Sequence, residues 1–265
     1  MTRPPRSLGG WSAYAPSVVV AFAFVATIVS TLFAESMLVH YTQKRRPQDR
    51  AWAISLAMFA LAAAALSVGT STGWDNGTFR VFFLFGAILN VPWLAMGTVF
   101  LLASPAVARR CHWGLVLFSG FAAGVMFSAP MATVRGDAIP VGKDVFDALP
   151  RILAAVGSSV AAIVILGGAI SSAVRYARDR SVPAHGRLAG ANGLIALGTL
   201  VLSSGGLLQG VVGHDEAFTL SLAVGISIIY GGFVLASGRR PKIGGADSGG
   251  DPDPGTDTRD KSHAE

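Results

Sequence analysis

Seven long apolar segments dominate the sequence and leave little room for a soluble domain. Each is close to or above the roughly 20 residues that a helix needs to cross a bilayer. Backbone polar groups in lipid must be satisfied within their own segment, so the segments are predicted to be helices. We therefore expect an all-α, polytopic membrane protein with a bundle of seven transmembrane helices, at about 15–38, 51–70, 79–104, 112–133, 150–174, 188–212 and 217–237.

The composition supports this class. Charged residues make up 14% of the chain, against about a quarter in a typical soluble domain. The net charge of +6 comes from basic residues that sit at helix ends, which is expected next to anionic headgroups. We therefore expect the lipid bilayer as a partner and no nucleic acid. The single cysteine, Cys111, excludes an intrachain disulfide and a cysteine-rich metal site.

Basic residues cluster in every second gap between the apolar segments. Clusters of Lys and Arg mark the cytoplasmic side of a membrane helix. The pattern therefore predicts an amino terminus outside and a carboxyl terminus in the cytoplasm, although Arg3 and Arg6 oppose it. These clusters are Lys44, Arg45, Arg46 and Arg50; Arg109 and Arg110; Arg175, Arg178, Arg180 and Arg187; and Arg239, Arg240 and Lys242. The gap after the fourth segment also holds Arg135, Lys143 and Arg151, but Asp137, Asp144 and Asp147 dilute their charge.

Three parts follow from this plan: a flexible tail at 1–12, the transmembrane domain at 13–238, and a disordered cytoplasmic tail at 239–265 that is rich in Gly, Pro and Asp. The first apolar segment lacks a clear cleavage site, which favours a retained anchor over a signal peptide. The longest loop, about 134–149, is expected outside, where it could pack over the helix ends. The composition is typical of a bacterial chain, and we expect the cell membrane as its location.

The most suggestive residues lie near the middle of the third segment. Pro92 cannot donate a hydrogen bond and should kink the helix. Asn90 is polar at mid-membrane depth, and Trp93, three residues later, shares its face. One hypothesis is a ligand pocket or gate on that face. The favoured alternative is a packing kink, in which Asn90 bonds a neighbouring helix.

Glu35 is the only acidic residue inside an apolar segment. A charged carboxylate costs about 3 kcal/mol at the bilayer centre and less near the ends. Glu35 lies toward the predicted cytoplasmic end, which allows two interpretations. It could accept a proton or act as a switch, or it could reach the inner surface and pair with Arg45 or Arg46. The second is favoured because the depth is shallow.

A second polar group, which includes Ser203 and Gln209, lies toward the outer end of the sixth segment. It leads to His214, Asp215 and Glu216, and the other outer loops are acidic too. Such a face could attract a cation or bind a metal. The spacing matches no metal signature, however, and solvated loop charges are the favoured interpretation.

Several chemistries lack their required residues. A retinal protein needs a lysine in its last helix, and the segment at 217–237 has none. The chain also has no phosphate-binding loop and no zinc-protease motif. We therefore expect no cofactor and no enzymatic activity.

The stretch from Lys44 to Leu102 resembles a family of uncharacterised seven-helix integral membrane proteins of actinobacteria. The similarity rests on Arg50-Ala-Trp52, Gly73-Trp74, Phe79-Arg80 and Asn90-Val-Pro-Trp93. More distantly, the basic first loop is similar to the seven-helix sensor regions that precede bacterial histidine kinases, although we expect no kinase domain after the last segment. The resemblance implies a seven-helix membrane fold, but it does not suggest any particular activity.

Two functions fit these features best. The first is a non-catalytic membrane sensor or accessory protein, which would act through a separate signalling or membrane partner. The alternative is a small-solute transporter or channel with a polar site in the middle of the third helix. A membrane enzyme is a third possibility, with only Glu35 and the His214 group behind it.

Overall fold

A computed structural model describes most of the chain as helices. The predicted tails at 1–12 and 239–265 lie outside the described residues, so the expectations for them stay predictions. The described residues are 15–136, 138–178, 190–191, 193–202, 204–205 and 215–237. The helices are α1 (Ala15–Lys44), α2 (Pro47–Thr72), α3 (Asn76–Phe82), η1 (Phe83–Leu89), α4 (Asn90–Leu102), α5 (Pro105–Ser128), α6 (Gly142–Val145), α7 (Ala148–Arg178) and α9 (Asp215–Ser237).

Six helices within the described residues are long and apolar enough to cross a membrane. Five of them are α1, α2, α5, α7 and α9, and the sixth is the continuous run Asn76–Leu102 formed by α3, η1 and α4. The predicted all-helical, multi-pass architecture is confirmed to this extent. The predicted segment at 188–212 contributes a shorter apolar helix, Gly193–Leu202.

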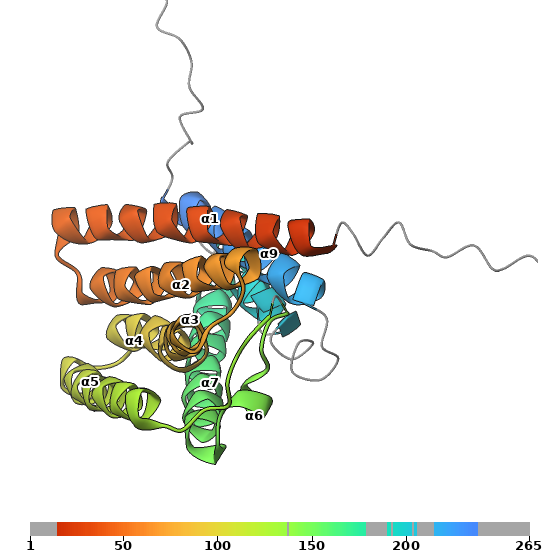
Figure 1. Ribbon diagram of the computed structural model, residues 1–265. Coiled ribbons are helices and arrows are strands. Elements are labelled where there is room, and N and C mark those ends of the chain that lie inside the picture. Colours follow the sequence, from red (N-terminus) through yellow and green to blue (C-terminus); the bar gives the residue numbers. More distant parts are fainter. Residues whose placement is uncertain are drawn as a thin grey trace, which may run out of the picture.

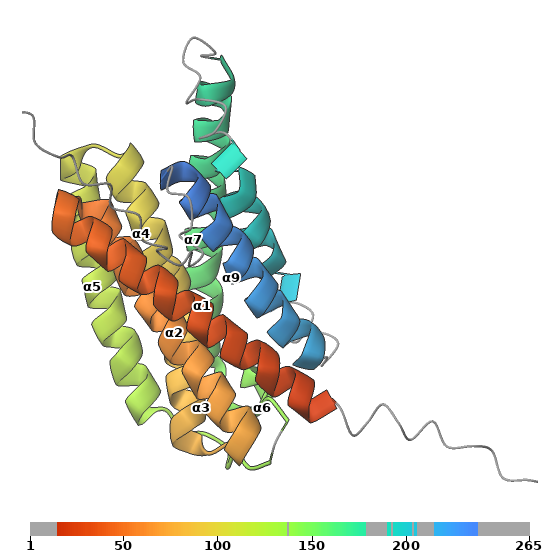
Figure 2. The same cartoon turned by 90° about the horizontal axis from the view of Figure 1, so that it is seen from above.

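The helices close into a ring. Figure 1 shows α1, α2, α4 and α5 stacked in that order, with α7 and α9 to one side. The strongest packing joins α1 to α2, α2 to α4, α1 to α9 and α4 to α7. Seen from above in Figure 2, α5 lies at the edge of the bundle. The ring has a basic end, where Lys44, Arg50 and Arg109 lie, and an opposite end that we call the capped end.

The turn between α2 and α3 depends on two glycines. Gly73 ends α2 with φ 92°, a left-handed value that favours glycine. Gly69 lies against the indole of Trp74, where a Cβ atom would collide with the ring. Asp75 then begins α3 because its side chain accepts the backbone N–H groups of Gly77 and Thr78, a standard helix cap.

The middle of the third span is a π-helix, which the sequence does not predict, and the kink expected at Pro92 stays a prediction. Phe83–Leu89 is π-helical, and the backbone N–H of Asn90 donates to the carbonyl of Phe85. Proline lacks an N–H and its ring crowds the carbonyl four residues earlier, and the wider π turn accommodates both effects. The hydroxyl of Ser158 in α7 donates to the carbonyl of Ala87 at 3.0 Å, which supplies a partner to this widened backbone.

The capped end is covered by the loop that joins α5 to α7, and the predicted packing of this loop over the helix ends is confirmed. The backbone N–H of Val134 donates to Asn76 Oδ1 at 2.8 Å. The backbone N–H of Trp74 donates to the carbonyl of Gly136 at 2.8 Å. Phe146, 3% exposed, stacks on Phe79 with ring centroids 5.6 Å apart. The loop therefore extends the apolar core beyond the helix ends.

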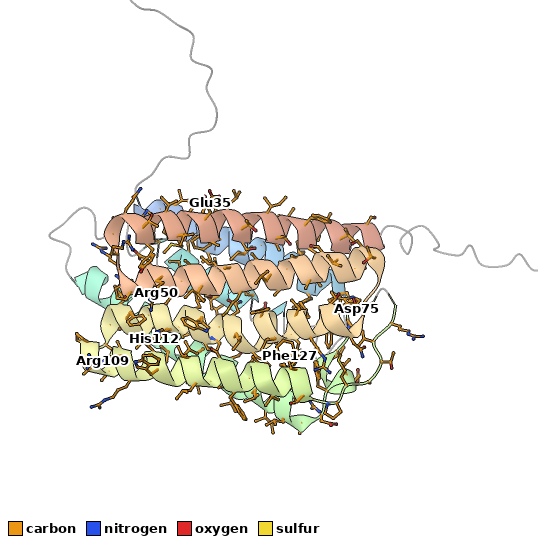
Figure 3. The ribbon with its side chains drawn as sticks, turned by 60° about the vertical axis from the view of Figure 1, so that its left-hand side comes forward. Glu35, Arg50, Asp75, Arg109, His112 and Phe127 are labelled. Carbon is orange, nitrogen blue, oxygen red and sulfur yellow. The ribbon has the colours of Figure 1, made fainter. Side chains whose placement is uncertain are left out.

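The helix α5 packs least tightly. Its described buried residues are Ala108, Ala122 and Met126, whereas Leu117 is 73% and Phe127 80% exposed. Figure 3 labels Phe127 on α5, which is the helix at the lower edge of the bundle in that view. Apolar side chains with this exposure suit a lipid-facing surface.

Candidate functional site

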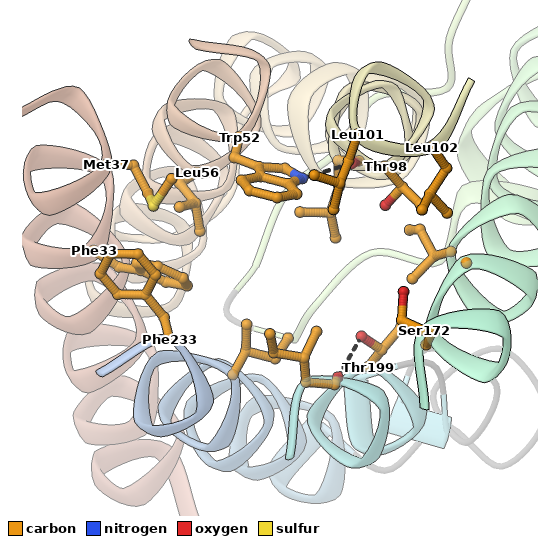
Figure 4. Close-up of a pocket in the computed structure, with 16 residues that line it drawn as sticks. Phe33, Met37, Trp52, Leu56, Thr98, Leu101, Leu102, Ser172, Thr199 and Phe233 are labelled. Carbon is orange, nitrogen blue, oxygen red and sulfur yellow. Dashed lines mark hydrogen bonds between the residues drawn. The ribbon is translucent and has the colours of Figure 1, made fainter. Parts of the chain in front are cut away.

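A cavity of about 150 Å³ lies inside the ring near the basic end. Figure 4 shows the hollow with the side chains around it. Its walls come from α1, α2, α4, α7, the Gly193–Leu202 helix and α9. The lining residues are mostly apolar: Phe33, Met37, Trp52, Leu56, Leu94, Thr98, Leu101, Leu102, Ile165, Gly168, Ala169, Ser172, Ile195, Thr199, Ile229 and Phe233.

Trp52 forms one wall of this cavity in a fixed position. Its indole N–H donates to the carbonyl of Leu94 at 3.2 Å. The ring lies so close to Gly97 that a Cβ atom there would collide with it. A hydrogen bond at one edge and a glycine beneath the ring therefore hold a large flat surface against the hollow.

The polar groups of the cavity are hydroxyls. Thr98, Ser172 and Thr199 line it (Figure 4), and the hydroxyl of Thr199 donates to the carbonyl of Ile195 at 2.8 Å. Gly168 lets α7 approach Thr98 of α4 closely. Among the described residues that line it, none carries a carboxylate or a basic group. Such a site can hold an apolar molecule and hydrogen-bond one or two of its atoms.

Asn90 bonds a neighbouring helix. The hydroxyl of Ser55 in α2 lies 2.8 Å from Asn90 Oδ1 and 3.0 Å from its carbonyl oxygen, and donates toward both. Asn90 does not line the cavity. This is the arrangement expected if Asn90 stabilises helix packing, because the oxygen of this half-buried amide accepts a hydrogen bond from a neighbouring helix.

Trp93 faces a different neighbour. Its indole N–H donates to Ser119 Oγ in α5 at 3.1 Å, and its ring meets His112 edge-on at 5.7 Å. Asn90 and Trp93 therefore contact α2 and α5, and neither lines the cavity. Pro92 instead lines a separate groove between α5 and α7. A ligand or gate role for these three residues stays a prediction.

Glu35 lies on the outward face of α1. It is exposed, and Figure 3 shows it pointing away from the bundle. Phe33 and Met37, which flank it at two residues' distance, are buried and face the cavity, so Glu35 does not. The predicted pairing with Arg45 or Arg46 is not seen in the described residues, and a proton-accepting role stays a prediction.

The outer polar group is only partly visible. Ser203, Gln209 and His214 lie outside the described residues. Asp215 accepts the backbone N–H of Ile139 at 3.0 Å, which ties the capping loop to α9. No group of three or more potential metal ligands occurs in the described part of the chain.

Two charged residues at the capped end have structural roles that the sequence does not reveal. Arg80 donates to the carbonyl oxygens of Met126 and Ala129, the latter at 2.9 Å, and so satisfies the free end of α5. Hydrogen bonds from the Thr78 side chain, then from the backbone of Thr78 and Gly77, hold the pKa of Asp75 below its usual value.

The basic end contains another pair of polar residues, Arg50 and His112, whose contact the sequence does not reveal. The guanidinium of Arg50 lies 3.4 Å from His112 Nε2. Arginine only donates, so a hydrogen bond between these two groups requires Nε2 to accept. Nδ1 of the same ring is buried and has no hydrogen-bond partner among the described residues. Figure 3 places Arg50, His112 and Arg109 at this end. The arrangement links α2 to α5.

No protein family, curated protein or solved structure matches the chain. The geometry of the cavity is therefore the main guide to function.

Proposed function

We propose that this chain is a non-catalytic sensor or accessory protein of the cell membrane that binds a small apolar molecule in its central cavity. The cavity is the observation that carries the proposal. Its wall comes from α1, α2, α4, α7, the Gly193–Leu202 helix and α9, so an occupant would contact most of the bundle. Binding would favour whichever helix arrangement fits the ligand best, and that shift is what a separate signalling partner would detect.

The size of the cavity limits the ligand. An apolar cavity of about 150 Å³ holds a molecule the size of benzene. Drug-sized ligands need pockets of roughly 300 Å³ or more. The hydroxyls of Thr98 and Ser172 favour a ligand with one hydroxyl or carbonyl group on an otherwise apolar body.

The proposal includes the seven-helix topology, with the amino terminus outside and the carboxyl terminus in the cytoplasm. Six long apolar helices and the shorter Gly193–Leu202 support seven crossings. The cavity would then open toward the cytoplasmic half of the membrane, beside Trp52 and Leu102. Reporter fusions after 45, 104 and 238 should read as cytoplasmic, and fusions after 74 and 138 as external. The opposite pattern would overturn the topology.

A binding assay tests the cavity directly. The purified protein would be titrated with benzene, phenol, cyclohexanol and 1-hexanol, and binding would be measured by calorimetry. Ala169→Leu fills the cavity from α7 and should weaken binding roughly tenfold or more, which corresponds to about 1.4 kcal/mol. Gly167→Leu is the matched control, because Gly167 lies on the same helix, does not line the cavity, and has open space at its Cβ position.

A second variant tests the hydroxyls. Thr98→Val keeps the shape and removes one hydroxyl, so it should weaken phenol about threefold to tenfold and leave benzene unchanged. Equal binding to wild type and Ala169→Leu would refute the site. If the protein in proteoliposomes showed saturable uptake of a solute, and Asn90→Ala abolished that uptake, the alternative function of a small-solute transporter would be supported instead.

A further inference from the structure

A groove of about 330 Å³ runs along the outside of the bundle between α5 and α7. Its floor is α4, at Pro92 and Met96. Its walls include Gly114 and Phe118 of α5 and Val160 of α7. The lining is almost entirely apolar, and all three helices belong to spans that can cross a membrane. The groove therefore lies where lipid chains would be.

The dimensions suit one extended chain. The lining runs from Cys111 to Phe118 on α5 and from Val156 to Val164 on α7. At 1.5 Å per residue these stretches are about 10 and 12 Å long. An acyl chain reaches about 15 Å from the headgroup region to the bilayer centre, so most of its length would fit in the groove.

Charge marks one end of the groove. Arg110 is exposed and precedes Gly114 by four residues, which places both on one stripe of α5. Arg109 is turned about 100° away from that stripe. An arginine at this position can form two hydrogen bonds with a phosphate.

We propose that an anionic phospholipid binds here, with one acyl chain in the groove between α5 and α7 and its phosphate at Arg110. The proposal rests on membrane insertion, which it shares with the proposed function. It does not rest on the central cavity, because Arg110 and Gly114 are not among the residues that line that cavity. The lipid would fill the space that weak packing leaves beside α5.

Native mass spectrometry of the full chain tests the proposal. The protein would be purified in detergent with palmitoyl-oleoyl phosphatidylglycerol or with the phosphatidylcholine of the same chains. Wild type should retain one phosphatidylglycerol in preference to phosphatidylcholine. Arg110→Gln should reduce that preference about fivefold, the effect of one arginine at an anionic surface, and Arg109→Gln should reduce it much less.

The groove itself has a matched pair of variants. Gly114 and Gly120 both lie on α5 with nothing within 4 Å of a Cβ atom, so leucine should be tolerated at both. Only Gly114 lines the groove. Gly114→Leu should abolish lipid retention and Gly120→Leu should not. Equal retention in both variants, or equal retention of the two lipids by wild type, would overturn the proposal.

Cys111 reports on the position of the lipid. It is the only cysteine in the chain and lines the groove, so wild type needs no other substitution. Phosphatidylglycerol should slow its reaction with N-ethylmaleimide, and phosphatidylcholine should slow it less. If neither lipid changes the rate at which Cys111 reacts, the acyl chain of the lipid does not occupy this groove. Binding of phenol to the central cavity, measured in Gly114→Leu, separates this failure from failure of the proposed function.

Discussion

The two ends of the bundle use the same device and differ in what surrounds it. At the capped end the indole of Trp74 lies on Gly69, and at the basic end the indole of Trp52 lies on Gly97. Trp74 is 3% exposed and is covered by the loop that joins α5 to α7. Trp52 borders the cavity. The capped end is filled by side chains, whereas the basic end encloses an empty space next to its tryptophan.

The two ends of the bundle therefore have different roles: the capped end stabilises the fold, and the basic end contains the proposed binding site. At the capped end the conspicuous polar residues are occupied by structural hydrogen bonds: Asn76, Arg80 and Asp215 each bond backbone groups. At the basic end the cavity is lined by apolar side chains and by uncharged hydroxyl groups such as those of Thr98 and Ser172. The capped end therefore supports the bundle, and the cavity is the place where a ligand would change it.

The largest contrast is expected from removal of a phenylalanine at each end. Phe146→Ala should cost about 4 kcal/mol, because a fully buried ring leaves a cavity. Phe233→Ala should cost about half as much, since Phe233 is half-buried and already borders an open space. Unfolding in mixed micelles would measure both. Similar losses would show that the basic end is packed as tightly as the capped end.

The next contrast concerns Arg80. Arg80→Leu removes the donors to two carbonyls at the end of α5 and should cost about 3 kcal/mol, as expected for hydrogen bonds to a charged group. Lys143→Gln is the control, because Lys143 is exposed at the same end and its loss changes the net charge equally. It should change the unfolding free energy by less than about 0.5 kcal/mol. Equal effects would show that the charge of Arg80 matters more than its hydrogen bonds.

The glycine pairs give a smaller and more specific contrast. Gly69→Ala forces the buried Trp74 to move and should cost about 2 kcal/mol, within the range for overpacking. Gly97→Ala can push Trp52 into the cavity and should cost about 1 kcal/mol, while weakening ligand binding. Both are glycine-to-alanine changes inside helices, so the gain in helix propensity cancels in the comparison. A larger loss for Gly97→Ala would contradict the hollow basic end.

The smallest effect is expected from the cap at Asp75. Asp75→Ala should cost about 1 kcal/mol at neutral pH. The pKa of Asp75 is lowered in the folded protein, so its contribution is present above the unfolded value of about 3.9 and is lost as the pH falls through the folded value. The difference in unfolding free energy between wild type and Asp75→Ala should therefore shrink below about pH 4. A constant difference down to pH 2 would show that the charge of Asp75 does not contribute.

Part of this structure can be predicted from the sequence. Apolar length predicts six of the spans, because the bilayer thickness sets a length that hydropathy reveals directly. The position of the loop over the helix ends also follows from its length. The π-helix does not follow, since Pro92 alone is equally compatible with a simple kink.

The cavity cannot be predicted because its residues carry no local signature. Phe33, Leu56 and Ile229 look like any apolar residues of a membrane helix, and only the closure of the ring places them around one space. The conspicuous candidate Asn90 bonds Ser55 instead. Arg80 shows the same limit, since its bond to Ala129 joins positions 49 residues apart in the sequence.

The π-helical run at Phe83–Leu89 has a consequence for the phase of the third span. A π turn takes one residue more than an α turn, and one residue corresponds to about 100° of rotation. The two halves of the span are thus out of step by that angle, and no single helical wheel describes both. Deletion of one residue within this run should rotate Trp93 away from Ser119 while leaving Phe79 against Phe146. The length of the π-helical run therefore determines which neighbouring side chains the α4 half of the span contacts.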